Sequence, residues 1–432
     1  MKFRTSLLSL ALTFFISCSA LATDSTSAAE DNNQGLIVIA HRGNSGGRPE
    51  HTLAAYRSAI RQGADFIEPD LVVTKDGVLI ARHEPEIGGT TDVADRPEFA
   101  DRITTKLLDG VPTEGWWAED FTLAEIKTLR ARERIPAIRP QNTAFNDRFK
   151  IPTLAEIIAL VRRQEARGRI VGIYPETKHP TYFSDDGEFL DGTPINMSLG
   201  KLLIDTLVAN DFTDPDRIFI QSFEFANLIE LQNDIMPQAG VDLPLVQLYG
   251  DIEDRFIQPA SSFSRPYDMI FNAASGADLN AIYGGLANLV EITPETGYSA
   301  LVTQEVISYI ANNYAEGMGP WKNSFLLREP LATPEDPNGD GIAQLGSKLT
   351  GEIGPLLPRA LQAGLMVHPY TLRAEENFLT QHANGVNQSV VAEAVQLYSL
   401  GVNGFFLDQP ADGVFARWLF LRSNQLRQRS ED

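Results

Sequence analysis

Short apolar and β-branched runs recur along this 432-residue chain, and longer helical or irregular segments separate them. This alternation restricts the fold more than any other feature, because strands that alternate with helices form parallel sheets. Eight runs are clear, and Leu289–Ile292 is a weaker ninth. The eight runs are Leu36–Ala40, Phe66–Val73, Val78–Ala81, Ile170–Tyr174, Ile218–Ile220, Leu243–Leu248, Leu365–Val367 and Gly404–Leu407. Eight or nine strands favour a closed α/β barrel, with an open doubly wound sheet as the alternative.

Helix signals lie between several of these runs. Thr52 precedes an apolar stripe that stops at Gly63, and residues 122–125 and 153–156 have the Thr-x-x-Glu spacing of a capping box. No Gly-x-Gly-x-x-Gly follows any of the runs, which disfavours a dinucleotide-binding sheet. Two stretches near 180–199 and 251–346 are poor in long apolar runs. We therefore expect residues 35–425 to form a single barrel domain, with insertions near 180–199 and 251–346.

The first 22 residues have the pattern of a signal peptide. Lys2 and Arg4 precede an apolar run, and residues 20–22 (Ala-Leu-Ala) supply the small-x-small pattern of a cleavage site. The run is too short to span a bilayer, so we expect an exported chain, periplasmic or secreted, with no stable membrane insertion. Residues 23–34 are small and polar, which indicates a flexible leader. A lipoprotein anchored through Cys18 is the alternative, although Phe15 fits such a cleavage site poorly.

The composition excludes thiol chemistry and disfavours polyanionic partners. Cys18 is the single cysteine, so either processing route leaves no disulfide and no thiol nucleophile. The formal net charge is −21, and it becomes −23 once Lys2 and Arg4 are removed with the signal peptide. A polyanion is repelled by such a chain, so nucleic acid is not expected as a partner.

Two histidines lie at the ends of apolar runs. His41 follows the first run and His83 follows the third, and polar residues at the ends of barrel strands face the mouth where chemistry occurs. A buried histidine with only a packing role is the alternative for either one alone. His368, at a further strand end, is left open. The others lie in polar or turn contexts that favour a surface or packing role: His51, His179 and His382.

Glu68 and Asp70 form an acidic pair inside an otherwise apolar run, Phe-Ile-Glu-Pro-Asp-Leu-Val-Val. Residues i and i+2 of a strand share a face, so the two carboxylates point the same way. Two like charges held together are unfavourable unless a cation or several donors neutralise them. An exposed acidic edge is the alternative, but the apolar context favours metal ligation. Donors that are all oxygen favour Ca²⁺ or Mg²⁺ over zinc.

The segment from Glu68 to His83 also has the pattern of a hairpin. A two-residue turn at 76–77 (Asp-Gly) places Asp70 opposite His83, and a turn one residue earlier places Glu68 there. Either register puts the histidine on the face of the acidic pair, whereas a three-residue loop does not.

Glu176 and Lys178 follow another run and share a face, and Arg42 comes directly after His41. An ordinary ion pair is the alternative interpretation of the glutamate and the lysine. Beside an acidic metal cluster, however, lysine and arginine suit the oxygens of a phosphate. A cation, two basic side chains and two histidines together suit phosphoryl transfer. A sugar hydrolase also uses paired acids, but it has no need of this positive charge.

These residues fall into an ordered set of motifs that resembles the glycerophosphodiester phosphodiesterase family, in particular its bacterial periplasmic branch. The resemblance spans roughly residues 36–418. The motifs are His41-Arg42-Gly43, Pro49–Leu53, Gly63–Asp65, Glu68-x-Asp70, Thr74–Gly77, His83, Gly172–Lys178, Gln221–Phe223, Val367–Thr371 and Gly401–Gly404 with Asp408.

The resemblance implies a (β/α)₈ TIM barrel of the phospholipase C-like phosphodiesterase type. It implies hydrolysis of glycerophosphodiesters to sn-glycerol 3-phosphate and an alcohol, with the substrate's own neighbouring hydroxyl attacking phosphorus. It also implies one divalent cation, Ca²⁺ in preference to Mg²⁺. The implied roles are acid and base for His41 and His83, metal ligation for Glu68, Asp70 and Glu176, and phosphate binding for Arg42 and Lys178.

The chain departs from the family pattern at two places. Glu84 stands where the family usually has aspartate after the second histidine, and the segment from about 251 to 346 matches poorly. Two alternative functions remain at this stage. A phosphatidylinositol-type phospholipase needs an apolar or basic face for lipid, which the negative charge disfavours. A surface binding protein on an inactivated barrel is disfavoured because both histidines and all three acids are present.

Overall fold

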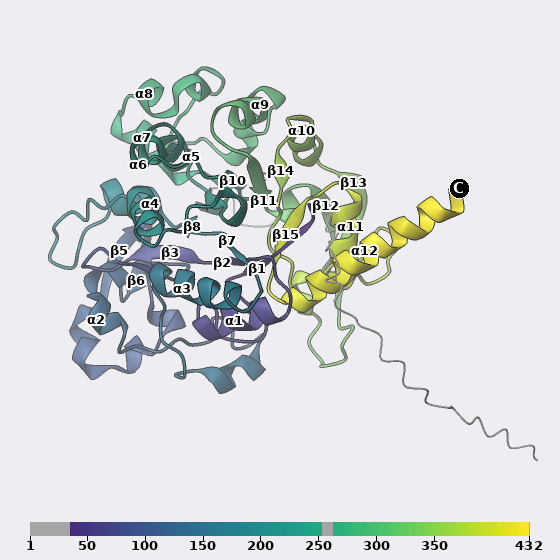
Figure 1. Ribbon diagram of the computed structural model, residues 1–432, viewed down its shortest axis with the longest axis horizontal. Coiled ribbons are helices and arrows are strands. Elements are labelled where there is room, and N and C mark those ends of the chain that lie inside the picture. The colour runs from purple at the N-terminus through teal and green to yellow at the C-terminus, as the bar shows by residue number, and fades with distance from the viewer. Residues whose placement is uncertain (1–34, 253–261, 432) are drawn as a thin grey trace, which may run out of the picture. The chain divides into compact units, whose positions relative to one another are not determined.

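The computed structural model describes residues 35–252 and 262–431, so the expected signal peptide (1–22) and leader (23–34) lie outside the described residues. Parallel strands form a barrel, and helices surround it (Figure 1). The barrel strands are β1 (Ile37–His41), β2 (Phe66–Glu68), β3 (Asp70–Val73), β7 (Gly172–Ile173), β8 (Glu176–Thr177), β9 (Ile220–Ser222), β10 (Leu245–Tyr249), β11 (Gly317–Pro320), β14 (Met366–Val367) and β15 (Gly404–Leu407).

The helices carry the remaining apolar faces. They are α1 (Leu53–Arg61), α2 (Leu123–Ile126), α3 (Leu154–Glu165), α4 (Leu199–Ala209), α5 (Phe225–Glu230), α6 (Met236–Ala239), α7 (Tyr267–Ser275), α8 (Leu279–Tyr283), α9 (Gln304–Asn313), α10 (Leu356–Gln362), α11 (Val390–Ser399) and α12 (Pro410–Glu431). The expected caps are confirmed: Thr52 accepts a hydrogen bond from Ala55, and α2 and α3 each begin with a complete capping box.

The barrel is closed rather than open. The first strand, β1, pairs in parallel with both β2 and the last strand, β15. The junction between β14 and β15 is completed by a hydrogen bond of 3.0 Å from the Phe406 N–H to the Pro369 carbonyl. Two of the eight positions in the ring are filled by broken strands, β2 with β3 and β7 with β8. The (β/α)₈ barrel is therefore confirmed, and the open doubly wound sheet is excluded.

One barrel strand was not expected. Strand β11 pairs with β10 and β14, although it lies inside the segment 251–346 that was interpreted as an insertion. Its sequence, Gly-Met-Gly-Pro, lacks the β-branched residues that mark a strand. Close packing explains the glycine, because a Cβ on Gly319 would lie only 2.4 Å from Leu248 Cδ2, too near for a side chain. The weaker ninth run, Leu289–Ile292, forms no strand. The stretch 180–199 lies between β8 and α4 and adds no barrel strand, as expected.

The hairpin register was also predicted wrongly. Strand β3 pairs with β4 (Leu79–Ala81) so that Val73 faces Leu79, which leaves a loop of three residues between Thr74 and Val78. Arg82, not His83, therefore follows opposite Asp70, and its N–H donates to the Asp70 carbonyl at 3.0 Å. The chain bends after the strand, and this bend rather than the ladder brings His83 to the site.

Side chains alternate between the two faces of the barrel wall. In β1, Val38 and Ala40 join the large core between strands and helices, whereas Ile39 packs inside the barrel. The inner cluster consists of Ile39, Phe66, Tyr174, Val246 and Phe406. Because residues i and i+2 share a face, the next inward positions beyond this apolar layer belong to the polar residues that end the strands.

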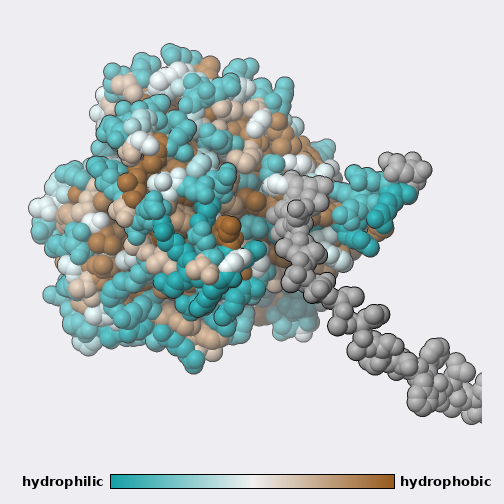
Figure 2. Space-filling model, viewed as in Figure 1, coloured by the Kyte–Doolittle hydropathy of each residue, from teal (hydrophilic) through white to brown (hydrophobic). Residues whose placement is uncertain are grey.

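Two antiparallel hairpins lie outside the barrel wall, β5 (Thr104–Leu108) with β6 (Val111–Gly115) and β12 (Leu326–Glu335) with β13 (Leu345–Ile353). The face seen in Figure 2 is mainly hydrophilic, with apolar residues in small separate patches. Within the described residues, no helix is both long enough and apolar enough to cross a bilayer.

Candidate active site

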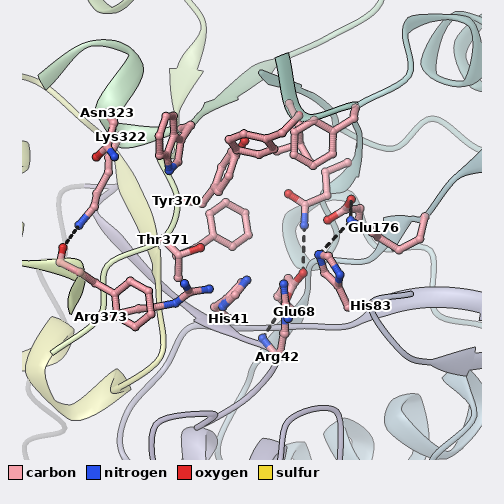
Figure 3. Close-up of a pocket in the computed structure, with 18 of the residues that line it drawn as sticks. His41, Arg42, Glu68, His83, Glu176, Lys322, Asn323, Tyr370, Thr371 and Arg373 are labelled. Atoms are coloured by element: carbon pink, nitrogen blue, oxygen red, sulfur yellow. Dashed lines mark hydrogen bonds and ion pairs between the residues drawn. The ribbon is translucent and has the colours of Figure 1, made fainter. Parts of the chain in front are cut away.

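The polar layer above the apolar interior opens into a cavity of about 670 Å³ (Figure 3). His41 continues the inward face of Ile39, Glu68 that of Phe66, and Glu176 that of Tyr174. Six of the seven predicted site residues line the cavity: His41, Arg42, Glu68, His83, Glu176 and Lys178. The seventh, Asp70, is buried directly behind them and is 1% exposed.

Three carboxylates converge on one point. Glu68, Asp70 and Glu176 each offer an oxygen, and these oxygens all lie within 4.8 Å of one another. The register of the barrel strands brings the carboxylates together, because Asp70 faces Glu176 across β3 and β8. Burial and the charge of Asp70 raise the pKa of Glu68 well above its usual value, and burial raises that of Glu176 to about 8. Such a cluster is unfavourable without a compensating positive charge.

Two further observations fit a cation in this cluster. All the donors are oxygens, which are the ligands that hard divalent cations prefer. Gln221 faces Glu176 across β8 and β9, and its Nε2 donates to Glu68 Oε1 at 3.4 Å. Its Oε1 is enclosed and has no hydrogen-bond partner among the described residues. An orphaned carbonyl beside three carboxylates is a costly arrangement that a bound cation relieves.

Two basic side chains flank the carboxylates. The backbone N–H of Arg42 donates to Glu68 Oε2 at 2.6 Å, and the Nε of its side chain lies 3.2 Å from Asp70 Oδ2. Despite the cost of burial, the Arg42 guanidinium holds the pKa of Asp70 well below its usual value. Lys178 Nζ donates to Glu176 Oε1 at 2.7 Å and lies 3.2 Å from His83 Nε2. The positive charge predicted for a phosphate is therefore in place on two sides of the cluster.

Each predicted catalytic histidine has a carboxylate partner on Nδ1. His41 Nδ1 lies 2.6 Å from Asp408 Oδ1, and His83 Nδ1 lies 2.5 Å from Glu84 Oε1. Burial and the neighbouring Arg42 lower the pKa of His41 to about 4 and that of His83 to about 3. Both rings are therefore neutral at pH 7. A carboxylate at Nδ1 holds the ring proton there, which makes Nε2 the accepting nitrogen. In His83 this nitrogen faces Lys178 Nζ at 3.2 Å.

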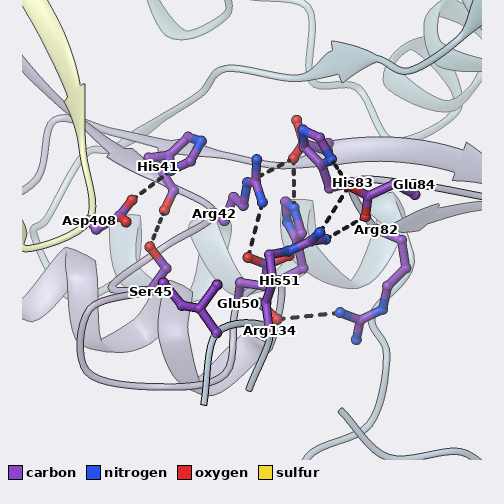
Figure 4. A network of polar contacts seen from close by, with 12 residues as sticks. His41, Arg42, Ser45, Glu50, His51, Arg82, His83, Glu84, Arg134 and Asp408 are labelled. Atoms are coloured by element: carbon purple, nitrogen blue, oxygen red, sulfur yellow. Dashed lines mark hydrogen bonds and ion pairs between the residues drawn. The ribbon is translucent and has the colours of Figure 1, made fainter. Parts of the chain in front are cut away.

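The partner of His83 belongs to a wider network (Figure 4). Arg134 donates to both oxygens of Glu84, at 2.9 and 2.6 Å, and its Nε donates to Glu50 Oε1 at 2.7 Å. Glu50 in turn accepts a hydrogen bond of 3.1 Å from Arg42. The network joins the second histidine to the arginine beside the first, through residues that sequence reasoning did not select.

Sequence reasoning assigned no role to several other contacts of the site. Asp408 ends a strand run and carried the same signal as His41 and His83, but it appeared only as part of the family resemblance. His51 is completely buried, and its Nε2 lies 2.9 Å from Asp70 Oδ2. A surface role for His51 is therefore excluded, and its packing role places it against an acid of the cluster. His368 is buried, and its Nδ1 is hydrogen-bonded to the Tyr174 hydroxyl at 2.9 Å.

Comparison with known proteins shows the family to which the chain belongs. Residues 41–302 match the model of the glycerophosphoryl diester phosphodiesterase family. The chain is 32% identical to glycerophosphodiester phosphodiesterase GDPD6 of Arabidopsis thaliana over 86% of its own length and 82% of that protein. It is 29% identical to a glycerophosphodiester phosphodiesterase of Haemophilus influenzae over 96% and 98% of the two chains. A crystal structure from Silicibacter pomeroyi, described as a putative glycerophosphoryl diester phosphodiesterase, superposes with a TM-score of 0.49 at 18% identity, over 88% and 93% of the chains. The chain belongs to the glycerophosphoryl diester phosphodiesterase family.

Proposed function

We propose that this protein hydrolyses glycerophosphodiesters to sn-glycerol 3-phosphate and an alcohol, in a reaction that requires one divalent cation. The observation that carries the proposal is the convergence in one cavity of an acidic cluster, two basic side chains and two histidines with carboxylate partners. The match to the family model and the names of the relatives support the same substrate class.

Different side chains bind the phosphate and transfer the protons. Arg42 and Lys178 bind the phosphodiester oxygens and offset the charge that develops on them. One histidine, as the neutral ring, accepts the proton of the hydroxyl that attacks phosphorus. The other must first bind a proton at Nε2, which the negative charge of the bound phosphodiester favours, and it gives that proton to the departing alcohol. Among the described residues, no serine, threonine or cysteine forms a hydrogen bond with the imidazole ring of His41 or His83, and Ser45 donates only to the backbone carbonyl of His41. This absence favours an attacking hydroxyl that belongs to the substrate rather than to the protein.

Glu68, Asp70 and Glu176 are the residues that would hold the cation. When bound, a divalent cation polarises the phosphoryl oxygens and lowers the pKa of a coordinated hydroxyl. We propose Ca²⁺ in preference to Mg²⁺, because Ca²⁺ binds oxygens at about 2.3–2.6 Å in flexible geometry and Mg²⁺ requires a tighter octahedron. Oxygens within 4.8 Å of one another suit the wider coordination sphere without rearrangement of the strands.

The test is hydrolysis of glycerophosphocholine, followed by the release of glycerol 3-phosphate. We expect activity with Ca²⁺, loss of activity with excess EDTA, and recovery on readdition of Ca²⁺. His41→Ala should abolish turnover, whereas His382→Ala, a half-buried histidine that does not line this cavity, should leave it unchanged. Hydrolysis that resists the chelator, or that survives loss of His41, would refute the proposal.

We also propose that the protein is exported, to the periplasm or outside the cell. The proposal rests on the signal-peptide pattern of residues 1–22. Amino-terminal sequencing of the protein recovered from its native compartment tests it. Cleavage after Ala22 supports a free exported protein, a lipidated terminus at Cys18 supports the lipoprotein alternative, and an intact Met1 rejects both.

A further inference from the structure

The cavity extends well beyond the reaction centre. Figure 3 shows Lys322, Asn323 and Arg373 at the end of the cavity opposite His83 and Glu176. A volume of about 670 Å³ falls within the range of about 300–1,000 Å³ that holds drug-sized ligands, so a glycerol phosphate fills only part of it. The remainder is available to the alcohol portion of a diester.

The far end is walled by the β12–β13 hairpin. Arg328 of β12 and Ser347 of β13 both line the cavity. The hairpin follows barrel strand β11, so it stands at the carboxyl end of the barrel where substrates enter. It also lies beyond residues 41–302, the part of the chain that the family model matches. The family match therefore assigns no role to the residues of this wall.

Arg328 is the unusual residue of the wall. It is only 8% exposed, and its Nε and Nη2 atoms are enclosed without a hydrogen-bond partner among the described residues. Burial lowers the pKa of Arg328, which the charge of Glu393 raises. Both oxygens of Glu393, however, lie 2.8 Å from Lys322 Nζ. A buried guanidinium with unused donors is costly, because its lost hydration is not replaced.

The surroundings of Arg328 carry an excess of positive charge. Lys322 and Arg373 line the same part of the cavity. Burial lowers the pKa of Lys322, and the charges of Arg328 and Arg373 lower it further. Arg373 shares its acid, Asp408, with Arg139, so one carboxylate serves two arginines. In a chain with a net charge of −21, this local excess points to an anion as the missing partner.

We propose that Arg328 binds a second anionic group, a carboxylate or a phosphate, on the alcohol portion of the glycerophosphodiester. A guanidinium binds either anion through charge-assisted hydrogen bonds, and Arg328 lines the cavity in which the anion would lie. The cleaved phosphodiester lies at Arg42 and Lys178, and the second anion lies at the hairpin end. The inference deepens the proposed function, on which it rests, by naming the substrate class: diesters whose alcohol is itself acidic.

A pair of substrates that differ by one carboxylate tests the inference. Glycerophosphoserine carries that group and glycerophosphoethanolamine lacks it. We expect kcat/KM to be higher for the serine diester, and Arg328→Gln to lower the serine-to-ethanolamine ratio about tenfold, the size of a charge-assisted hydrogen bond. Arg328→Lys should restore part of the ratio, because it keeps the charge but not the fork. Glycerophosphoglycerol with and without a terminal phosphate repeats the comparison and shows which anion is preferred.

Arg265→Gln is the matched control. Arg265 lines the same cavity, but its side chain is 25% exposed and is paired with Glu295 at 3.2 Å. Its loss removes one positive charge from the cavity and should leave the substrate ratio unchanged. Equal ratios in the wild-type protein and Arg328→Gln, or an equal fall in Arg265→Gln, would overturn the inference.

Binding without turnover separates this inference from the proposed function. In a His41→Ala background, glycerophosphoserine should raise the melting temperature more than glycerophosphoethanolamine, and Arg328→Gln should remove the difference. Melting curves without ligand show whether the hairpin variants are folded. If the wild-type protein hydrolyses neither diester while the His41→Ala variant still binds glycerophosphoserine selectively, the proposed function is rejected and the anion site is kept. Hydrolysis of both diesters without selectivity would do the reverse.

Discussion

Asp408 Oδ1 lies 2.6 Å from His41 Nδ1, although 367 positions separate the two residues in the chain. Barrel closure produces the contact, because β1 and β15 are neighbours and each of the two residues stands at the end of its strand. Arg139 and Arg373 both donate to the other oxygen of Asp408. The carboxylate is therefore held from both sides, and it fixes the orientation and the tautomer of the histidine ring.

Replacing Asp408 with asparagine should lower kcat about 10²-fold with little change in KM, which is within the range for loss of acid–base catalysis. The amide group can present a donor to His41 Nδ1, which favours the wrong tautomer. Steady-state kinetics with glycerophosphocholine measure both constants. Asp412→Asn, at a half-buried carboxylate in α12, is the control. If the two variants have the same kcat, Asp408 does not position His41.

Arg134 should matter for activity although it lies outside the cavity wall. Arg134→Gln frees Glu84 from a two-point contact, so His83 loses a fixed partner, and kcat should fall about tenfold as for other outer-shell partners. Arg132→Gln removes an arginine two positions earlier whose ion pairs are made with exposed acids, and it should be neutral. Stopped assays over a range of substrate concentrations separate kcat from KM. A loss confined to KM would contradict a positioning role for Arg134.

Calcium should stabilise the fold through the acidic cluster. We expect Ca²⁺ to raise the melting temperature of the wild-type protein relative to EDTA, because only the folded chain brings the three carboxylates together. Glu68→Gln should reduce this difference, and it should lower the affinity for Ca²⁺ measured by calorimetry. Glu133→Gln replaces a buried acid outside the cluster and should preserve the full shift. A Ca²⁺ shift that persists in Glu68→Gln would place the ion elsewhere.

Buried His368 should make the protein sensitive to acid. Burial lowers the pKa of His368 to about 3 in the folded state, against 6.5 for an unhindered ring. Above pH 6.5 the ring is neutral in both states and has no effect on stability. As the pH falls from 6.5 towards 3, only the unfolded chain takes up the proton, so the free energy of unfolding falls, by about 2 kcal/mol at pH 5. His368→Gln should have a shallower pH dependence in urea titrations, whereas the half-buried His382→Gln should follow the wild type. Equal slopes in all three proteins would show that His368 does not resist protonation.

Much of the barrel could be predicted because its strands are buried on both faces. Runs such as Gly404–Leu407 are apolar throughout, so they are visible in the sequence. Strand β11 was missed because its glycines serve close packing against β10 rather than strand propensity. The β3–β4 register was missed because turns of two and three residues fit the same letters at 74–78, and only tertiary packing decides between them.

The residues that line the cavity were easier to predict than the residues that hold them in place. His41, Glu68 and Glu176 each end a strand, and the barrel places all strand ends together. Arg134 lies in a segment between α2 and α3 with neither strand nor helix periodicity, so no local pattern connects it with Glu84. Its position depends on how a long loop folds back over the barrel, which is a property of the whole chain.

The pairing of β1 with β15 also determines when the site can be completed during biosynthesis. A ribosome makes His41 near the start of the chain and Asp408 only near its end. Until the last strand has been translated and released, the first strand lacks a neighbour on one edge and the histidine lacks its carboxylate. The complete site therefore forms in one late step, when the last strand joins the first, rather than growing with chain length.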